Sequence, residues 1–268
     1  MSQAAPNTPL GHYRVKHVAK SEVVKVLTLR STAITLALTV GIGLLVTGLV
    51  ANAALHQAPN YYIGFDPTQQ SLVGLIVAGL TGGVFGALLI TGEYASGTIR
   101  TTLSATPNRT VLLAAKIGVT TVITMAFCEV LSFVSFWLGQ AVLSGGGAPS
   151  ASLASPGALR AVTLTGVFIA LMALMSFGFG LILRSTAGAI AAYVGVVFVL
   201  PLVMRAISAT DVRYLPTNIL TNSVMSTVNQ GPGGTLRPLS PAVGLLLMTV
   251  YAAVALIAGA VTFVRRDG

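Results

Sequence analysis

Charged side chains are so rare in this chain that each one is a candidate for chemistry. The 268 residues include 15 Lys or Arg, 6 Asp or Glu and 3 His. Glu129 lies within a long apolar stretch, where an ionisable group is costly and usually faces a partner or a cavity. Two roles follow for it: a protonated structural group hydrogen-bonded to Ser132 or a neighbouring helix, or part of a translocation path that binds a cationic substrate.

The sequence lacks the motifs of independent catalysis. It has no G-x-x-x-x-G-K-[ST] loop to cradle ATP phosphates, no H-E-x-x-H or Cys/His metal cluster, and no G-x-S-x-G nucleophile elbow. The histidines are scattered, and Cys128 is the single cysteine. We therefore expect a chain that is not an enzyme on its own, holds no metal and binds no cofactor itself.

The composition indicates an integral membrane protein. Hydrophobic residues make up 54% of the chain and charged residues only 8%, with a net charge of +9. Disordered chains are rich in charge, disulfide scaffolds need several cysteines, and soluble nucleic-acid binders need more charge to coat their surface. We expect the lipid bilayer as a partner and no nucleic acid.

An all-α fold with six transmembrane helices is predicted. Six stretches approach or exceed the roughly 20 apolar residues that cross a bilayer: 32–52, 71–91, 111–138, 161–183, 187–204 and 242–264. Eleven of the 15 basic residues fall in the segments on the N-terminal side of the membrane, and four fall in the outer segments. By the positive-inside rule, this predicts a multi-pass protein of the cell membrane with both termini cytoplasmic.

The predicted organisation has three parts. Residues 1–31 form a cytoplasmic tail with an amphipathic helix over 12–30, residues 32–264 form the six-helix domain, and residues 265–268 form a cytoplasmic C-terminus. The amphipathic helix is expected to lie in the membrane interface with its basic face toward anionic headgroups. The alternative is that these residues are helical but serve only as the basic segment that sets the orientation of the first span.

The loop between the second and third spans, 92–110, is the most informative stretch. Ile99 and Leu103 are four residues apart and share one face of a short helix, while Thr106 and Pro107 resemble an N-cap and first helical residue. Such a helix suits docking onto a cytoplasmic partner. Alternatively, it covers the membrane-facing ends of its neighbours.

Two further features leave alternatives open. The outer loop 205–241 contains a helical pattern over 217–228, which lies on the surface or dips into the membrane. Overlapping small-xxx-small pairs, Gly79/Gly83 and Gly82/Gly86, allow close helix approach, at a dimer seam or within one subunit.

Three stretches give the chain a recognisable pattern. They are SEVVKVLTLRS (21–31), with Glu22, Lys25 and Arg30; GEYASGTIRTTLSATPNRTVLLAAK (92–116), with Glu93, Gly97, Thr98, Arg100, Pro107, Arg109 and Lys116; and LRSTAGAI (183–190). In these stretches the chain resembles the permease subunits of type-2 ATP-binding-cassette exporters, particularly the small six-span bacterial kind. Val23 departs from the aromatic residue that the family usually has there.

The resemblance implies roles for these segments. The N-terminal helix, with Glu22, Lys25 and Arg30, would be the elbow helix, and residues 93–105, including Ile99 and Leu103, would be the coupling helix that inserts into a separate ATPase subunit. ATP and Mg would bind on that partner. A second permease, identical or different, would complete the path for export of an amphiphilic small molecule, lipid-like compound or peptide.

Two other classes of function compete with transport. One is a non-transporting membrane protein, such as an immunity or signalling subunit, which would need no ATPase. The other is an intramembrane enzyme that relies on Glu129, which lacks an evident second catalytic group and is the weakest of the three.

Overall fold

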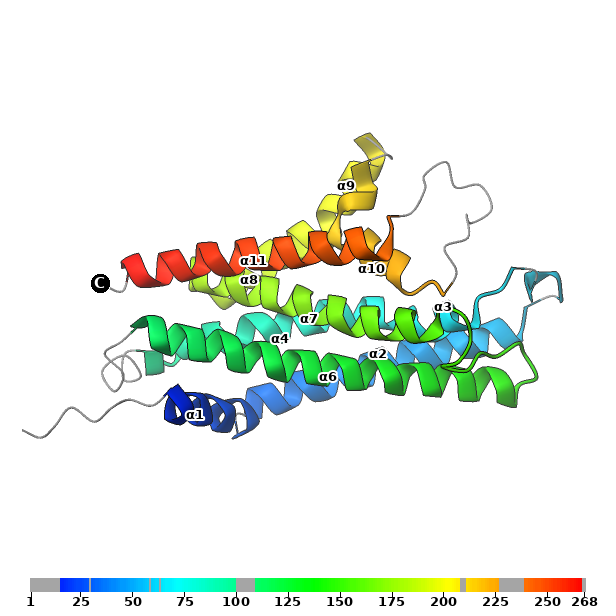
Figure 1. The fold of residues 1–268 in the computed structure, drawn as a ribbon, viewed down its shortest axis with the longest axis horizontal. Coiled ribbons are helices and arrows are strands. Elements are labelled where there is room, and N and C mark those ends of the chain that lie inside the picture. Colours follow the sequence, from blue (N-terminus) through cyan, green and yellow to red (C-terminus); the bar gives the residue numbers. More distant parts are fainter. Residues whose placement is uncertain are drawn as a thin grey trace, which may run out of the picture.

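The chain folds into a bundle of long helices with a shorter helix across one end (Figure 1). The computed structural model describes residues 15–28, 30–57, 59–62, 64–99, 109–207, 211–226 and 239–266. These residues form helices and no β-strand, which confirms the all-α prediction. The helices are α1 (Val15–Thr28), α2 (Arg30–Leu55), α3 (Pro67–Leu72), α4 (Gly74–Ala95), α6 (Arg109–Gly145), α7 (Ala158–Leu183), α8 (Thr186–Val194), α9 (Leu200–Ile207), α10 (Pro216–Ser223) and α11 (Pro241–Arg266).

Six helical segments of the described chain are long and apolar enough to cross a membrane. They are Arg30–Leu55, Pro67–Ala95, Arg109–Gly145, Ala158–Leu183, Thr186–Ile207 and Pro241–Arg265. The second consists of α3 and α4, and the fifth of α8, the π-helical turn η2 (Gly195–Val199) and α9. The predicted number of spans is confirmed, and the chain has the make-up of a multi-pass membrane protein.

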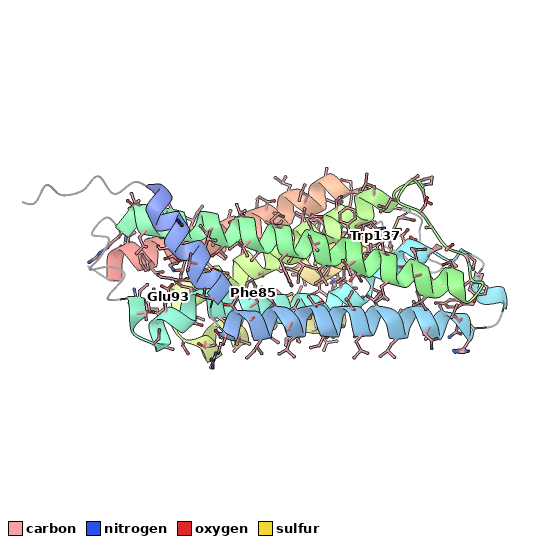
Figure 2. All side chains as sticks on the ribbon, turned by 90° about the horizontal axis from the view of Figure 1, so that it is seen from below. Phe85, Glu93 and Trp137 are labelled. Atoms are coloured by element: carbon pink, nitrogen blue, oxygen red, sulfur yellow. The ribbon has the colours of Figure 1, made fainter. Side chains whose placement is uncertain are left out.

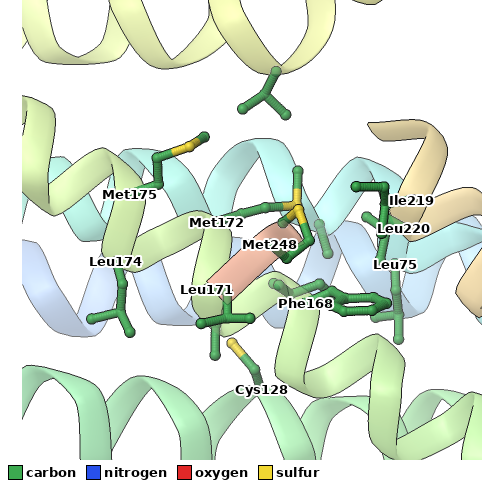
Figure 3. Packing of buried hydrophobic residues seen from close by; sticks show 14 of the residues in the cluster. Leu75, Cys128, Phe168, Leu171, Met172, Leu174, Met175, Ile219, Leu220 and Met248 are labelled. Atoms are coloured by element: carbon green, nitrogen blue, oxygen red, sulfur yellow. The ribbon is translucent and has the colours of Figure 1, made fainter. Parts of the chain in front are cut away.

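Helix α7 is the centre of the bundle. Its most apolar window is 78% buried, whereas that of α2 is 17% buried. Figure 3 shows Met172 of α7 beside Met248 of α11, and Leu171 of α7 near Cys128 of α6, within one continuous apolar core. Helix α7 packs directly against α4, α6, α8, α10 and α11 and holds them together.

The small residues of α4 serve packing within the chain. A methyl group at Gly86 would overlap the backbone of Ala173 in α7, and one at Gly83 would overlap the ring of Tyr193 in α8. The Tyr193 hydroxyl donates a hydrogen bond of 2.6 Å to the Gly79 carbonyl. Of the two predicted uses of these glycines, the structure therefore shows contact between helices of one subunit.

The fifth span is broken at a proline. Pro201 has no N–H to donate to the carbonyl of Val197, four residues earlier. The hydroxyl of Thr217 in α10 donates to that carbonyl instead. The Leu200 N–H bonds to the Gly195 carbonyl, which makes the π-helical turn.

Helix α10 is shorter than the predicted helix over 217–228. It begins at Pro216 and ends at Ser223, and it packs against α7 and α11 with Ile219 and Leu220 buried in the core. The segment is therefore part of the bundle, at the end opposite α1 (Figure 1). A short 3-10 turn, η3 (Asp211–Tyr214), precedes it.

Candidate functional site

Four charged side chains meet at the end of the bundle where α1 and the end of α11 lie (Figure 1). We call this the basic end, because it carries the following residues: Lys20, Lys25, Arg109, Lys116, Arg184 and Arg265. The four that meet are Glu22 and Lys25 of α1, Glu93 of α4 and Lys116 of α6, called here the ion-pair cluster. Figure 2 shows Glu93 near the end of α4, beside α1.

Lys116 is the centre of the ion-pair cluster. Its Nζ lies 2.5 Å from Glu22 Oε2 and 2.6 Å from Glu93 Oε1. Lys25 Nζ donates to Glu22 Oε1 at 2.9 Å and lies 3.7 Å from Glu93 Oε1. The two ammonium groups and two carboxylates balance in charge and join three helices.

The ion-pair cluster is largely shielded from solvent. The side chains of Glu22 and Lys116 are each 4% exposed, and that of Glu93 is 10% exposed. Only Lys25, at 35%, reaches the surface. Charges this deeply buried are tolerated because they are paired and hydrogen-bonded, so loss of one partner leaves another uncompensated.

The pKa values of Glu22 and Lys25, the two members of the cluster in α1, both shift in the direction that favours the charged side chain. Burial by itself raises the pKa of Glu22, but the nearby Lys116 and Lys25 ammonium groups outweigh it and hold the pKa below 4.5. Burial likewise lowers the pKa of Lys25, but hydrogen bonding to Glu22 and the charges of Glu93 and Glu22 raise it above 10.5. Both groups therefore remain ionised across the physiological range.

Glu93 lies in a different element from the one the sequence pattern predicted. Helix α4 continues to Ala95, so Glu93 belongs to its last turn and is buried in the ion-pair cluster, outside any loop helix. The helix extends beyond residue 91, where the apolar run of the second span was taken to end. A turn follows at Ser96 and Gly97, where Gly97 has φ of 70°, which glycine adopts without strain.

The rest of the predicted coupling segment is described in part. Thr98 is exposed and Ile99 is buried, and both are helical. Ile99 packs with Leu113 of α6 and Phe263 of α11, so its side chain covers the ends of neighbouring helices. The predicted residues Arg100, Leu103 and Pro107 lie outside the described residues.

The remaining predicted basic residues begin helices. Arg109 is the first residue of α6 and is partly buried, and Arg30 is the first residue of α2 and is exposed. Neither forms an ion pair in the described part of the chain. Of the three residues that were predicted for the elbow helix, Glu22 and Lys25 lie in α1 and belong to the ion-pair cluster, whereas Arg30 begins α2 and lies outside it.

Glu129 is separate from the ion-pair cluster. It is partly buried in α6 and lies against Gly166 of α7, where a methyl group would meet its carboxyl carbon at 2.9 Å. The predicted partner Ser132 donates instead to the Val162 carbonyl, at 2.7 Å. Within the described residues, no hydrogen bond to the Glu129 carboxyl is formed.

A second polar joint lies at the opposite end of the bundle and was missed by the sequence interpretation. Asp66 caps α3 by accepting from the backbone N–H groups of Thr68 and Gln69, and its other oxygen accepts from the N–H of Ser226 at 2.7 Å. Arg160 of α7 donates to the Ser226 carbonyl at 2.8 Å. The sequence feature that could have indicated it is Asp66 followed by Pro67, which is typical of an N-cap and the first residue of a helix.

These arrangements join helices through paired charges and hydrogen bonds. Within the described ranges, no group of three or more His, Cys, Asp or Glu side chains could hold a metal. The carboxylates of the ion-pair cluster are paired with lysines, and Glu93 Oε2 is buried without a hydrogen-bond partner among the described residues. What the cluster does is fix α1 to the two helix ends that flank residues 100–108.

The fold and the ion-pair cluster define a helical multi-pass membrane protein with an N-terminal helix fixed to its basic end. The model of the family described as "Protein of unknown function (DUF2705)" matches residues 26–268, and the chain belongs to this family. No curated protein matches the chain.

Proposed function

We propose that this chain is the permease subunit of an ATP-binding-cassette exporter. It would pair with a second permease, form the translocation path and couple to a separate cytoplasmic ATPase subunit that binds ATP and Mg. The cargo class that fits is an amphiphilic small molecule, lipid-like compound or peptide. In this arrangement the basic end and both termini face the cytoplasm, α1 is the elbow helix, and the segment after α4 carries the coupling helix.

The observation that carries the proposal is the ion-pair cluster. Glu93 lies six residues before residue 99 at the end of α4, and Lys116 lies seven residues after Arg109 at the start of α6. Lys116 therefore joins the two helices on either side of the segment that would dock on the ATPase, and it ties both of them to α1 through its contact with Glu22. A displacement of that segment would move both helices and α1 together.

Transmission through the cluster follows from its burial. A buried ion pair is either made with good geometry or broken at considerable cost, so it passes on a displacement instead of absorbing it. ATP binding on the partner would supply the energy, through contacts that differ between two states of the permease. The chain's own part is to bind the partner and to move α1, α4 and α6 as one unit.

The test is to look for a P-loop ATPase in a reading frame beside that of this chain and to ask whether the two co-purify after co-expression in membranes. Disruption of Arg100 is expected to abolish the association while the chain still inserts, and Lys20→Ala, on the exposed face of α1, is the control. ATP hydrolysis by the purified complex, stimulated by candidate amphiphiles, then reports cargo.

The outcomes separate the functional classes. Association that survives deletion of residues 95–105 would refute the docking assignment. A chain that is functional with no ATPase and no ATP-driven flux would instead be an immunity or signalling subunit. A turnover that Glu129→Gln abolishes without ATP would indicate an intramembrane enzyme.

A further inference from the structure

An apolar cavity of about 560 Å³ lies between α7, α9 and α11. Its size is within the range of roughly 300–1,000 Å³ that is usual for ligand sites. Met175, Phe179 and Ile182 of α7 form its floor. The hydroxyl of Tyr251, at one end of the cavity, already donates to the Tyr214 carbonyl at 3.0 Å. The walls therefore suit hydrocarbon and give water few partners.

The break in the fifth span creates this cavity. After the π-helical turn and Pro201, α9 leans away from the bundle, as Figure 1 shows, and packs against η2 and η3. Leu202 and Ile207 of α9 are 70% and 75% exposed. The space between α9 and α11 over α7 is thus left open at its side.

The mouth of the cavity faces the hydrocarbon of a bilayer. Leu200 of α9 and Val250 and Val254 of α11 form its rim and are exposed, with Val254 at 61%. All three lie well inside segments that are long enough to span the membrane. The molecules that reach this mouth in a membrane are acyl chains and other helices.

The two ends of the cavity distinguish between these occupants. At the end away from the basic end, Leu215, Pro216 and Tyr251 line it, and the Tyr251 hydroxyl connects α11 to the Tyr214 carbonyl of η3 across this end. A spanning helix, about 10 Å wide and continuous across the membrane, needs a groove that is open at both ends. An acyl chain, in contrast, can end inside the cavity next to Leu215 and Pro216.

The other end of the cavity leads to positive charge. Two residues of the cavity wall, Ile182 of α7 and Ala258 of α11, lie close in sequence to this end. Arg184 follows Ile182 by two residues, and it donates to the carbonyl of Thr262, one helical turn after Ala258. Arg265 lies further along α11 and is exposed. Arginine guanidinium groups at the membrane surface attract anionic headgroups.

We propose that this cavity binds one acyl chain of an anionic bilayer phospholipid, with its phosphate headgroup at Arg184 and Arg265. The site does not depend on the proposed transport function. It would make a bound lipid part of the contact between α9, α10 and α11.

The test uses the full chain reconstituted in vesicles of phosphatidylglycerol and phosphatidylcholine with a trace of phosphatidylglycerol that carries a photoreactive group in mid-chain. Crosslinks are expected on peptides that contain 175–182 and 250–258. Ala258→Trp, which fills the cavity wall, should lower the yield about tenfold, equivalent to about 1.4 kcal/mol of binding free energy. Ile257→Trp, one residue away on the exposed face, should leave it unchanged.

Other measurements keep the proposal open to contradiction. Crosslinks spread evenly over the exposed faces of α2, α6 and α11, or a yield that Ala258→Trp leaves unchanged, would overturn it. A disulfide between two copies of Val250→Cys would assign the mouth to a second copy of the chain. A phosphatidylcholine probe that labels as well as the phosphatidylglycerol probe would overturn the headgroup assignment. Val196→Trp, on the opposite wall, is the second variant should Ala258→Trp misfold.

Discussion

Lys116 of α6 lies 2.5 Å from the carboxylate of Glu22 in α1, although 94 residues separate them in the chain. The same ammonium group also lies 2.6 Å from Glu93 at the end of α4. One buried cation therefore connects the N-terminal helix with both helices that flank the segment 100–108. This makes α1 a part of the bundle's packing, beyond any role at the membrane surface.

Replacement of Lys116 by Met is expected to destabilise the basic end strongly. The change leaves Glu22 and Glu93 buried without their central partner, and loss of one member of a buried ion pair typically costs about 3–5 kcal/mol. Thermal unfolding in mild detergent should show a lower Tm, and proteolysis should cleave around α1 earlier. Lys20→Met, on an exposed position of α1, should change neither.

A neutral version of the ion-pair cluster provides the matched comparison. When Lys116→Met is combined with Glu22→Gln and Glu93→Gln, no buried carboxylate remains, and most of the lost stability should return. Lys25 then turns its partly exposed ammonium to water. A triple variant as unstable as Lys116→Met alone would show that uncompensated carboxylates are not the cause of the lost stability.

The stability contributed by Glu22 should depend on pH only in acid. Because its pKa in the folded chain is below 4.5, its ionised form stabilises the fold above that pH, and the contribution is lost as the pH falls through the lowered pKa. Lys25 has a pKa above 10.5, so its contribution is complete below that pH and is lost as the pH rises through the raised value. The stabilising effect of the pair should therefore be constant across the neutral range.

The measurement is Tm against pH for the wild type and Glu22→Gln. The difference between them should be constant in the neutral range and shrink below pH 4.5. A difference that shrinks around neutral pH would place the titration on another group.

The spans could be predicted from the sequence because bilayer thickness sets their length. Arg30–Leu55, Ala158–Leu183 and Pro241–Arg265 all contain the stretch that hydropathy selected. The α1 helix was likewise evident from its periodicity. These features depend on local composition, which one chain displays directly.

The ion-pair cluster could not be predicted in the same way. Periodicity places Glu22 and Lys25 on a helix but does not tell which other helix they meet. Lys116 was noted as a topology signal and as part of the motif in 92–116, with no partner assigned, and Glu93 was assigned to the loop because the apolar run of α4 weakens before the helix ends. Contacts between residues far apart in sequence depend on how the spans are arranged around α7.

The hydrogen bond from Thr217 to Val197 is expected to depend on Pro201. Thr217→Val removes the donor and leaves the Val197 carbonyl unpaired, which should cost about 0.6–1.7 kcal/mol, as for other side-chain hydrogen bonds in membranes. Pro201→Ala returns a backbone N–H that can pair with that carbonyl. In a double-mutant cycle followed by thermal unfolding, Thr217→Val should therefore cost much less when Pro201 is Ala.

The control for this cycle is Thr249→Val in α11. Its hydroxyl donates to the Leu245 carbonyl of its own helix, a bond that the backbone ladder does not need. The Thr249→Val substitution should therefore lower stability by the same small amount whether residue 201 is Pro or Ala. Equal costs of Thr217→Val in both backgrounds would contradict the role assigned to Pro201.

Gly86→Ala is expected to separate α4 from α7. The added methyl group would overlap the Ala173 backbone, which cannot move aside as a flexible side chain can, and overpacking of this kind costs about 1–3 kcal/mol. Gly48→Ala in α2 is the control, because nothing lies within 4 Å of its added methyl group, and it should be neutral or slightly stabilising. Thermal unfolding of both variants in the same detergent measures the difference. If Gly86→Ala were as stable as Gly48→Ala, α4 and α7 would not be packed as closely as described, and the small residues of α4 would again be available to a second copy of the chain.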